Sequence, residues 1–284
     1  MSWDVTFPNI IQNLSIWIKV NIMPSKFVFF FLQMIASLLL AENAIAKTKE
    51  LLIEADFYCP YNCGPKDERK GFAVELAEAA LAGSGYSIRY EIVPWNRAVR
   101  RAQQGLSQGV FGGTGFDSES AGPPLLLKHR VPLAILQYAV FARPGVSWKY
   151  DGPHSLEGKK VGLVAGYEQV LFGHLGDFLL IKAGRNFIEF SYGDSAGRNN
   201  LLKLINKRVD LIIDDERVLR RIAKEEGISQ DAFIRVAELG PKPFNFYLAM
   251  SPKYKDAEEV LKILDQRLLE MMKSGEFEKI MKRY

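Results

Sequence analysis

The chain has 284 residues, of which 48% are hydrophobic and 25% charged, with a formal net charge of +4. This composition is that of an ordinary globular protein and excludes collagen-like, low-complexity and disordered chains. The basic clusters Arg97–Arg100–Arg101 and Arg217–Arg220–Arg221 have helical spacing and are typical of solvent-exposed helix faces, so we expect no nucleic-acid partner. Two cysteines and three histidines show none of the spacings typical of zinc sites, and we expect neither a metal nor another cofactor.

The first 46 residues have the features of a cleavable signal peptide. Residues 27–40 are almost wholly apolar but too few to span a bilayer of about 30 Å as a helix. Lys26 precedes them, and Ala44-Ile45-Ala46 follows with the small-x-small pattern that signal peptidase cleaves. We predict export to the periplasm and a mature chain from Lys47; residues 1–22 are either a long leader or lie upstream of the true start. A retained signal anchor is the alternative.

The rest of the chain alternates between strand and helix patterns. The expected strands are 51–57, 86–93, 109–112, 160–165, 187–192, 209–214, 233–239 and 246–250. The expected helices are 72–80, 95–104, 168–183, 201–206, 216–226 and 257–272. Strands separated by helices predict an α/β fold with parallel sheets, here in two lobes divided near residues 143–153. A cleft between such lobes is the expected ligand site.

Three stretches, in this order, carry a resemblance to a known family: residues 71–76 (GFAVEL), 155–162 (SLEGKKVG) and 274–280 (SGEFEKI). They are similar to three segments of the bacterial extracellular solute-binding proteins of family 3, which serve amino-acid-type ABC transporters. These segments are the start of the first helix, the start of the second lobe and the end of the C-terminal helix. The resemblance implies the type II periplasmic-binding-protein fold, two lobes with mostly parallel sheets joined by two crossover strands. It implies lobe 1 at 47–140, lobe 2 at 141–238 and a return to lobe 1 at 239–284.

The same resemblance implies a monomer that captures a small polar solute, amino-acid-like or related, for an ABC transporter permease. A sensing module for a membrane receptor is one alternative. A periplasmic enzyme on the same fold, similar to cyclic-acid dehydratases, is another, and Glu168 with Asp215 is the acid/base pair that the sequence offers for it. The GxSxG match at 105–109 lies between a helix and a strand, the reverse of a nucleophile elbow, so we expect no catalytic site.

The resemblance also implies which residues hold the ligand. Tyr58 and Trp95 occupy its aromatic positions, where rigid rings give large contact areas and attract cations. Gly113 and Gly115 belong to a loop similar to one that offers backbone N–H groups to a carboxylate. Asp215 falls where the family has an acid that pairs with the ligand ammonium, and a helix cap is its second possible role.

Two departures from the family pattern change the expected ligand. The family's carboxylate-binding arginine would fall near Ser120, where residues 117–120 include no basic residue. In lobe 2, a Gly-Thr turn is replaced by Gly166 followed by Tyr167 and Glu168, which we expect at the site. Either the ligand is less anionic than a standard amino acid, or an arginine elsewhere supplies the charge; the candidates are Arg97, Arg130 and Arg198.

In an oxidising compartment we expect Cys59 and Cys63 to form a disulfide that braces the turn carrying Tyr58 and Tyr61. Two free thiols are the alternative. The CxxxC spacing differs from the CxxC of oxidoreductases, so we expect no redox chemistry. Lobe closure would bend the chain at crossovers near Gln137–Arg143 and Leu239–Phe246.

Overall fold

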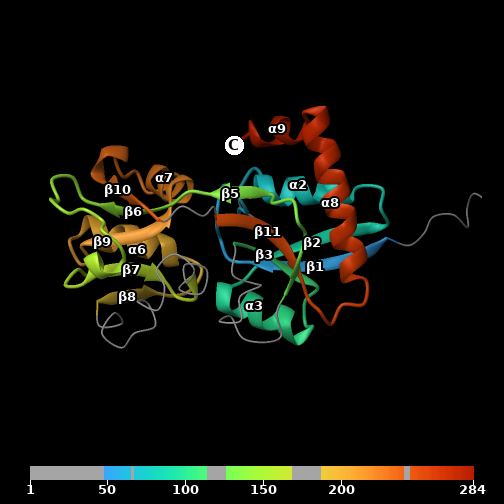
Figure 1. The fold of residues 1–284 in the computed structure, drawn as a ribbon, viewed down its shortest axis with the longest axis horizontal. Coiled ribbons are helices and arrows are strands. Elements are labelled where there is room, and N and C mark those ends of the chain that lie inside the picture. The colour runs from blue at the N-terminus through green and yellow to red at the C-terminus, as the bar shows by residue number, and fades with distance from the viewer. Residues whose placement is uncertain (1–47, 65–66, 114–125, 168–186, 240–243) are drawn as a thin grey trace, which may run out of the picture. The chain divides into compact units, whose positions relative to one another are not determined.

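The computed structural model describes residues 48–64, 67–113, 126–167, 187–239 and 244–284 (Figure 1). The predicted signal peptide, the predicted helix 168–183, Gly115, Glu168 and the stretch around Ser120 lie outside these described residues. None of the described helices is long and apolar enough to cross a membrane.

Lobe 1 is built on a six-stranded sheet with the order β2-β1-β3-β11-β4, and β5 pairs with another part of β11. Its strands are β1 (Lys49–Ala55), β2 (Tyr86–Ile92), β3 (Gly109–Gly112), β4 (Leu127–Lys128), β5 (Ala134–Leu136) and β11 (Phe244–Met250). Its helices are α2 (Phe72–Leu81), α3 (Trp95–Gln104), α8 (Ala257–Ser274) and α9 (Glu276–Met281). Helix α2 packs against α8 and α9, so the end of the chain returns to the lobe in which the described part begins.

Lobe 2 is built on a five-stranded sheet with the order β10-β6-β9-β7-β8. Its strands are β6 (Tyr138–Ala142), β7 (Val161–Val164), β8 (Ile188–Ser191), β9 (Leu211–Asp215) and β10 (Ile234–Glu238). Its described helices are α6 (Ala196–Ile205) and α7 (Glu216–Glu225), with short 3₁₀ helices η2 (Pro153–Leu156) and η4 (Gln230–Ala232). The chain enters this sheet after Gln137, between β5 and β6, and leaves it after β10.

Both sheets are mixed rather than mostly parallel. Strand β1 pairs parallel with β2 and β3, and β7 pairs parallel with β8 and β9. Strands β6 and β11, which follow the two crossings between lobes, pair antiparallel with every described neighbour. Each of these strands is connected to the other lobe and not, through a helix, to a neighbouring strand of its own sheet. The parallel pairing that a βαβ connection requires therefore does not apply to them.

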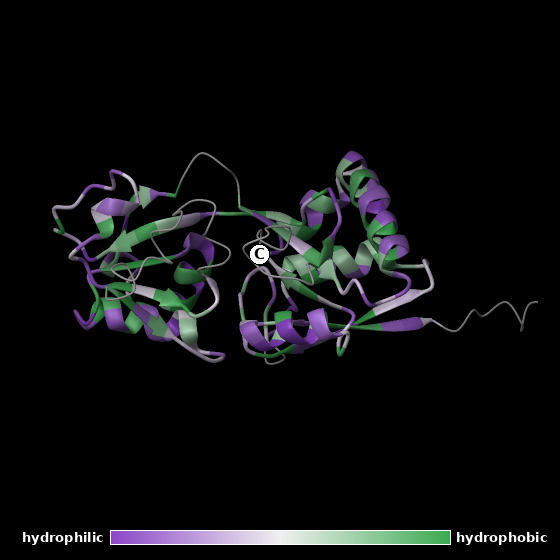
Figure 2. Ribbon diagram, turned by 60° about the horizontal axis from the view of Figure 1, so that its bottom comes forward, coloured by the Kyte–Doolittle hydropathy of each residue, from purple (hydrophilic) through white to green (hydrophobic). Residues whose placement is uncertain are grey.

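The hydrophobic periodicity of the sequence explains most elements. Helix α8 buries Ala257, Leu261, Leu264, Leu268 and Met271, spaced three or four residues apart, as an amphipathic helix does. The helix ribbons in Figure 2 accordingly alternate between hydrophobic and hydrophilic residues. Helix α3 and strand β3 have the predicted bounds, whereas α6 begins five residues before the predicted helix 201–206. That first turn is Ala-Gly-Arg-Asn-Asn, which has no apolar periodicity.

Candidate functional site

A cavity of about 500 Å³ lies where the loop after β1 meets the ends of the lobe 2 strands. Residues of both lobes line it. From lobe 1 these are Asp56, Phe57, Tyr58, Gly64, Asp67 and Ile92. From lobe 2 they are Val164, Tyr167, Gly193, Asp194, Ser195, Ala196, Gly197, Arg198, Asp214, Val218, Ile222, Glu225 and Glu226. Loops at the carboxyl ends of strands are the expected place for a ligand in α/β sheets.

The described lining is strongly acidic. It contains six carboxylates, Asp56, Asp67, Asp194, Asp214, Glu225 and Glu226, against one cationic side chain, Arg198. Arg198 already pairs with Glu226, with 2.6 Å between Nε and the carboxylate, and Arg221 pairs with both Asp67 and Glu225. Within the part of the chain that the structure describes, Asp56, Asp194 and Asp214 form no salt bridge. The cavity therefore offers three uncompensated carboxyl groups.

Asp214 is the most deeply placed of these groups, 1% exposed at the end of β9. Its Oδ1 accepts hydrogen bonds from the Tyr58 hydroxyl at 3.3 Å and from the Asp215 backbone N–H at 2.8 Å. No hydrogen bond from a described residue reaches Oδ2. Burial raises the pKa of Asp214 to about 8, because the anion loses its hydration, and the hydrogen bond from the Asp215 backbone N–H opposes this shift. A positive charge in the cavity would favour the ionised form.

Asp56, directly after β1, is the second carboxyl group of the cavity. Its Oδ2 accepts a hydrogen bond from the Tyr167 hydroxyl at 2.7 Å, which joins lobe 1 to lobe 2. Burial raises the pKa of Asp56 to about 7, against the opposing effect of that hydrogen bond. The rings of Tyr58 and Tyr167 meet edge to face with centroids 5.8 Å apart, so aromatic faces and carboxylates line the cavity together.

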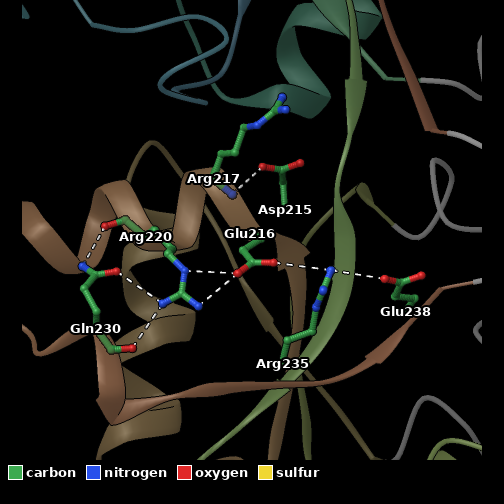
Figure 3. A network of polar contacts seen from close by, with 7 residues as sticks. All are labelled: Asp215, Glu216, Arg217, Arg220, Gln230, Arg235 and Glu238. Atoms are coloured by element: carbon green, nitrogen blue, oxygen red, sulfur yellow. Dashed lines mark hydrogen bonds and ion pairs between the residues drawn. The ribbon is translucent and has the colours of Figure 1, made fainter. Parts of the chain in front are cut away.

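The sequence offered two roles for Asp215, pairing with the ligand ammonium and capping a helix. Asp215 is fully buried. Its Oδ1 accepts the backbone N–H groups of Arg217, at 2.9 Å, and Val218, at 3.3 Å, so it caps α7 (Figure 3). Its Oδ2 accepts the Tyr61 hydroxyl at 2.9 Å and the Gln137 backbone N–H. The predicted helix cap is confirmed, and among the described lining residues the neighbouring Asp214 reaches the cavity instead.

The other predicted site residues have different surroundings. Tyr58 and Tyr167 line the cavity, as expected of site residues. Trp95 is not among its lining residues; it is buried behind Tyr167, with ring centroids 6.3 Å apart. Arg97 is exposed on α3, and Gly113 is buried just after β3; neither is among the described lining residues. Of the three candidate arginines, only Arg198 lines the cavity, whereas Arg130 lies near Asp265 of α8.

The Cys59–Cys63 disulfide is present, as predicted. Tyr58 lies directly before the disulfide-closed turn, and its hydroxyl binds Asp214. Tyr61 lies within the turn, and its hydroxyl binds Asp215. A further contact between the lobes follows this turn in the sequence, where Arg221 of α7 forms an ion pair with Asp67 at 2.9 Å. The turn thus carries the lobe 1 side chains that contact the end of β9 and the start of α7.

Asp56 and Asp194 were missed as site residues. Asp56 follows a strand directly, and the rule that ligands gather at the carboxyl ends of parallel strands was a signal that could have found it. Asp194 lies in the turn before α6, a helix start that the sequence pattern placed too late.

No protein-family model and no curated protein matches this chain. Solved structures do match. A histidine kinase sensor domain with similarity to periplasmic binding proteins aligns with a TM-score of 0.66 and 18% identity, over 84% of this chain and 96% of that one. An ancestral arginine-binding protein bound to arginine aligns with a TM-score of 0.63 and 19% identity, over 83% and 97%.

The arginine-, lysine-, histidine-binding protein ArtJ from Geobacillus stearothermophilus also aligns, with a TM-score of 0.63 and 17% identity, over 83% of this chain and 95% of that one. These similarities confirm the fold: the described chain is a periplasmic-binding-protein fold of two α/β lobes joined by two crossings. Amino-acid-binding proteins of ABC transporters are among its structural relatives, in line with the sequence resemblance.

Proposed function

We propose that this protein is an exported solute receptor that captures a small, positively charged solute in the cavity between its lobes. The observation that carries the proposal is the acidic lining of that cavity, where the described residues bring six carboxyl groups against one arginine that is already ion-paired. Carboxylates and aromatic faces together are the chemistry that recognises ammonium and guanidinium groups.

Among the described residues that line the cavity, one segment favours a negative group on the solute. The first turn of α6, at Ala196 and Gly197, lines the cavity, and a helix N-terminus favours negative charge. An amino-acid-like solute would therefore direct its carboxylate to α6 and its cationic group to Asp214 and Asp56. The similar structures that bind arginine support a ligand of this charge.

The receptor would act by closing on the solute and presenting the closed form to a membrane protein in the periplasm. A transporter permease is the partner we favour, because the similar solute-binding proteins serve ABC transporters. A sensor kinase is the alternative partner, which the match to a kinase sensor domain supports.

Native mass spectrometry of the protein purified after export would identify a solute that remains bound. Calorimetric titration with arginine, lysine, a diamine, glutamine and glutamate then tests the charge preference. We expect cations to bind at least about tenfold more tightly than glutamine of similar size, because one charge-assisted hydrogen bond is worth about 1.5–3 kcal/mol. Equal or tighter binding of glutamate would contradict the proposal.

An enzyme of the dehydratase type remains the second candidate, and one observation favours it. Asp56 and Asp214 line the same cavity with pKa values raised to about 7 and about 8, the range in which a general acid and base work at neutral pH. This pair would replace Glu168 and Asp215. Product formation from carboxylated ring compounds, lost in Asp214→Asn, would establish the enzyme, whereas saturable binding without product supports the receptor.

A further inference from the structure

The cationic residues of α7 form a stripe along one face of the helix. They are Arg217, Arg220, Arg221 and Lys224, at positions i, i+3, i+4 and i+7. The sequence alone indicates a simple solvent-exposed face. The structure instead places all four along a second hollow, a groove of about 890 Å³. Like charges at this spacing repel one another, so the stripe needs a counter-charge.

The opposite wall of the groove comes from lobe 1. Arg69 and Arg283 add two more cations there, and the half-buried Pro60 and Met281 add apolar surface. Among the described residues, the groove is thus lined by six cationic side chains against two side-chain carboxylates, Asp67 and Glu68.

Several of these cations have partners within the protein. Arg220 pairs with Glu216 and donates to Gln230 (Figure 3), and Arg69 and Arg283 share Glu75. Among the described residues, no salt bridge includes Arg217 or Lys224. The Arg217 guanidinium lies over the Tyr61 ring, 5.9 Å from its centroid, and Lys224 is exposed. Arg217 also donates to the Tyr61 hydroxyl at 3.3 Å, and its charge lowers the pKa of nearby Asp215. Lys224 therefore supplies the groove's positive charge that no described residue compensates.

We propose that this groove docks an acidic segment of a protein partner, a stretch in which carboxylates flank an apolar side chain. The volume is that of a site for a large ligand rather than for one phosphate. The apolar lining at Pro60 and Met281 would take a side chain that a free anion does not have. A charged rim around apolar surface is typical of protein interfaces.

The groove would bind best when the lobes are closed, because α7 belongs to lobe 2 and the facing wall to lobe 1. Asp67 lines both the groove and the acidic cavity, and its ion pair with Arg221 lies between them. A partner in the groove would therefore sense the lobe arrangement that encloses a solute. This inference rests on the proposed receptor function, in which a membrane partner distinguishes the closed form.

Fluorescence anisotropy with a fluorescein-labelled peptide of repeated Glu-Leu-Glu units tests the groove, with the matching Gln-Leu-Gln peptide for comparison. At about 50 mM salt we expect saturable binding of the acidic peptide only, weakened by added salt. Lys224→Glu should lower its affinity about threefold to tenfold, and Arg217→Gln should lower it to a smaller extent. Lys262→Glu on α8 is the matched control, since Lys262 is exposed and lies outside the groove.

Binding that Lys224→Glu leaves unchanged, or that Lys262→Glu weakens equally, would overturn the proposal, as would the absence of saturable peptide binding. Capture by phosphatidylglycerol vesicles without peptide binding would assign the groove to membranes and also overturn it. Solute titrations on the same variants keep the two proposals separate, because Lys224 does not line the acidic cavity. Peptide binding with no solute binding would refute the receptor function alone.

Discussion

Asp214 and Asp215 are neighbours at the end of β9, yet they belong to two different regions. Asp214 belongs to the acidic cavity, where Oδ2 accepts no hydrogen bond from a described residue. Asp215 belongs to what we call the crossover joint, formed by Asp215, Gln137 and Tyr61, where four donors occupy its two oxygens. Successive side chains of a strand point to opposite faces, so one position along the chain separates ligand chemistry from structural support.

The comparison shows how to distinguish the two roles of a buried carboxyl group. A carboxylate whose lone pairs are used by the protein has little capacity left for a ligand. Asp215 ties α7 to the first crossover, because Gln137 lies between β5 and β6, and to lobe 1 through Tyr61. At Asp214, Oδ2 accepts no hydrogen bond from a described residue, and the pKa of the carboxyl group is raised. Substitutions should therefore be able to damage the two regions separately.

The largest expected effect is on stability at the crossover joint. Asp215→Ala removes the cap of α7 and leaves the Tyr61 hydroxyl and Gln137 N–H without their acceptor. We expect the free energy of unfolding to fall by about 3–5 kcal/mol, measured by urea denaturation. Asp214→Asn is the control and should change it much less. An equal loss in both variants would remove the distinction between the two regions.

The second effect is on solute affinity at the cavity. Asp214→Asn replaces a carboxylate by a neutral amide of the same shape and should weaken a cationic solute about tenfold to a hundredfold in calorimetry. Asp231→Asn, at an exposed position of η4, is the matched control and should bind as the parent does. Unchanged affinity in a folded Asp214→Asn protein would exclude Asp214 from the site.

The disulfide joins the two regions, since Tyr58 reaches the cavity and Tyr61 the crossover joint from the same turn. A Cys59→Ser/Cys63→Ser double variant should lose about 2 kcal/mol of stability, the value expected for so short a closed loop. Solute affinity should fall along with it. Thermal melts with and without a reducing agent check this, because reduction should destabilise the parent and leave the variant unchanged.

Much of the fold follows from the sequence, whereas the site follows only in part. Apolar periodicity was sufficient for α8, which buries a regular stripe, mainly against α2. Pro94 was sufficient to place the start of α3. Strand β6 was missed as a strand because it is apolar throughout and fully buried, with no alternation to mark it. Tyr58 and Tyr167, which the resemblance selected, line the cavity. The resemblance did not distinguish Asp214 from Asp215, because that depends on which face of β9 borders the cavity.

The last expected effect is on the pH dependence of solute binding, about tenfold per pH unit for each carboxyl group that must lose a proton. Asp56 and Asp214 have pKa values of about 7 and about 8 in the solute-free protein. A cationic solute requires their ionised forms, so below these pKa values binding must first expel a proton. Each proton expelled lowers affinity about tenfold per pH unit as the pH falls.

Affinity should therefore be constant above about pH 9 and fall progressively toward pH 6. Calorimetry in buffers of different ionisation enthalpy would also detect the released protons. Asp214→Asn should remove the part of the dependence near pH 8 and keep the part near pH 7 that Asp56 supplies. Asp231→Asn should keep the complete profile. A flat profile in the parent between pH 6 and 9 would mean that neither carboxyl group meets the solute's charge, which would return the cavity acids to a structural role like that of Asp215.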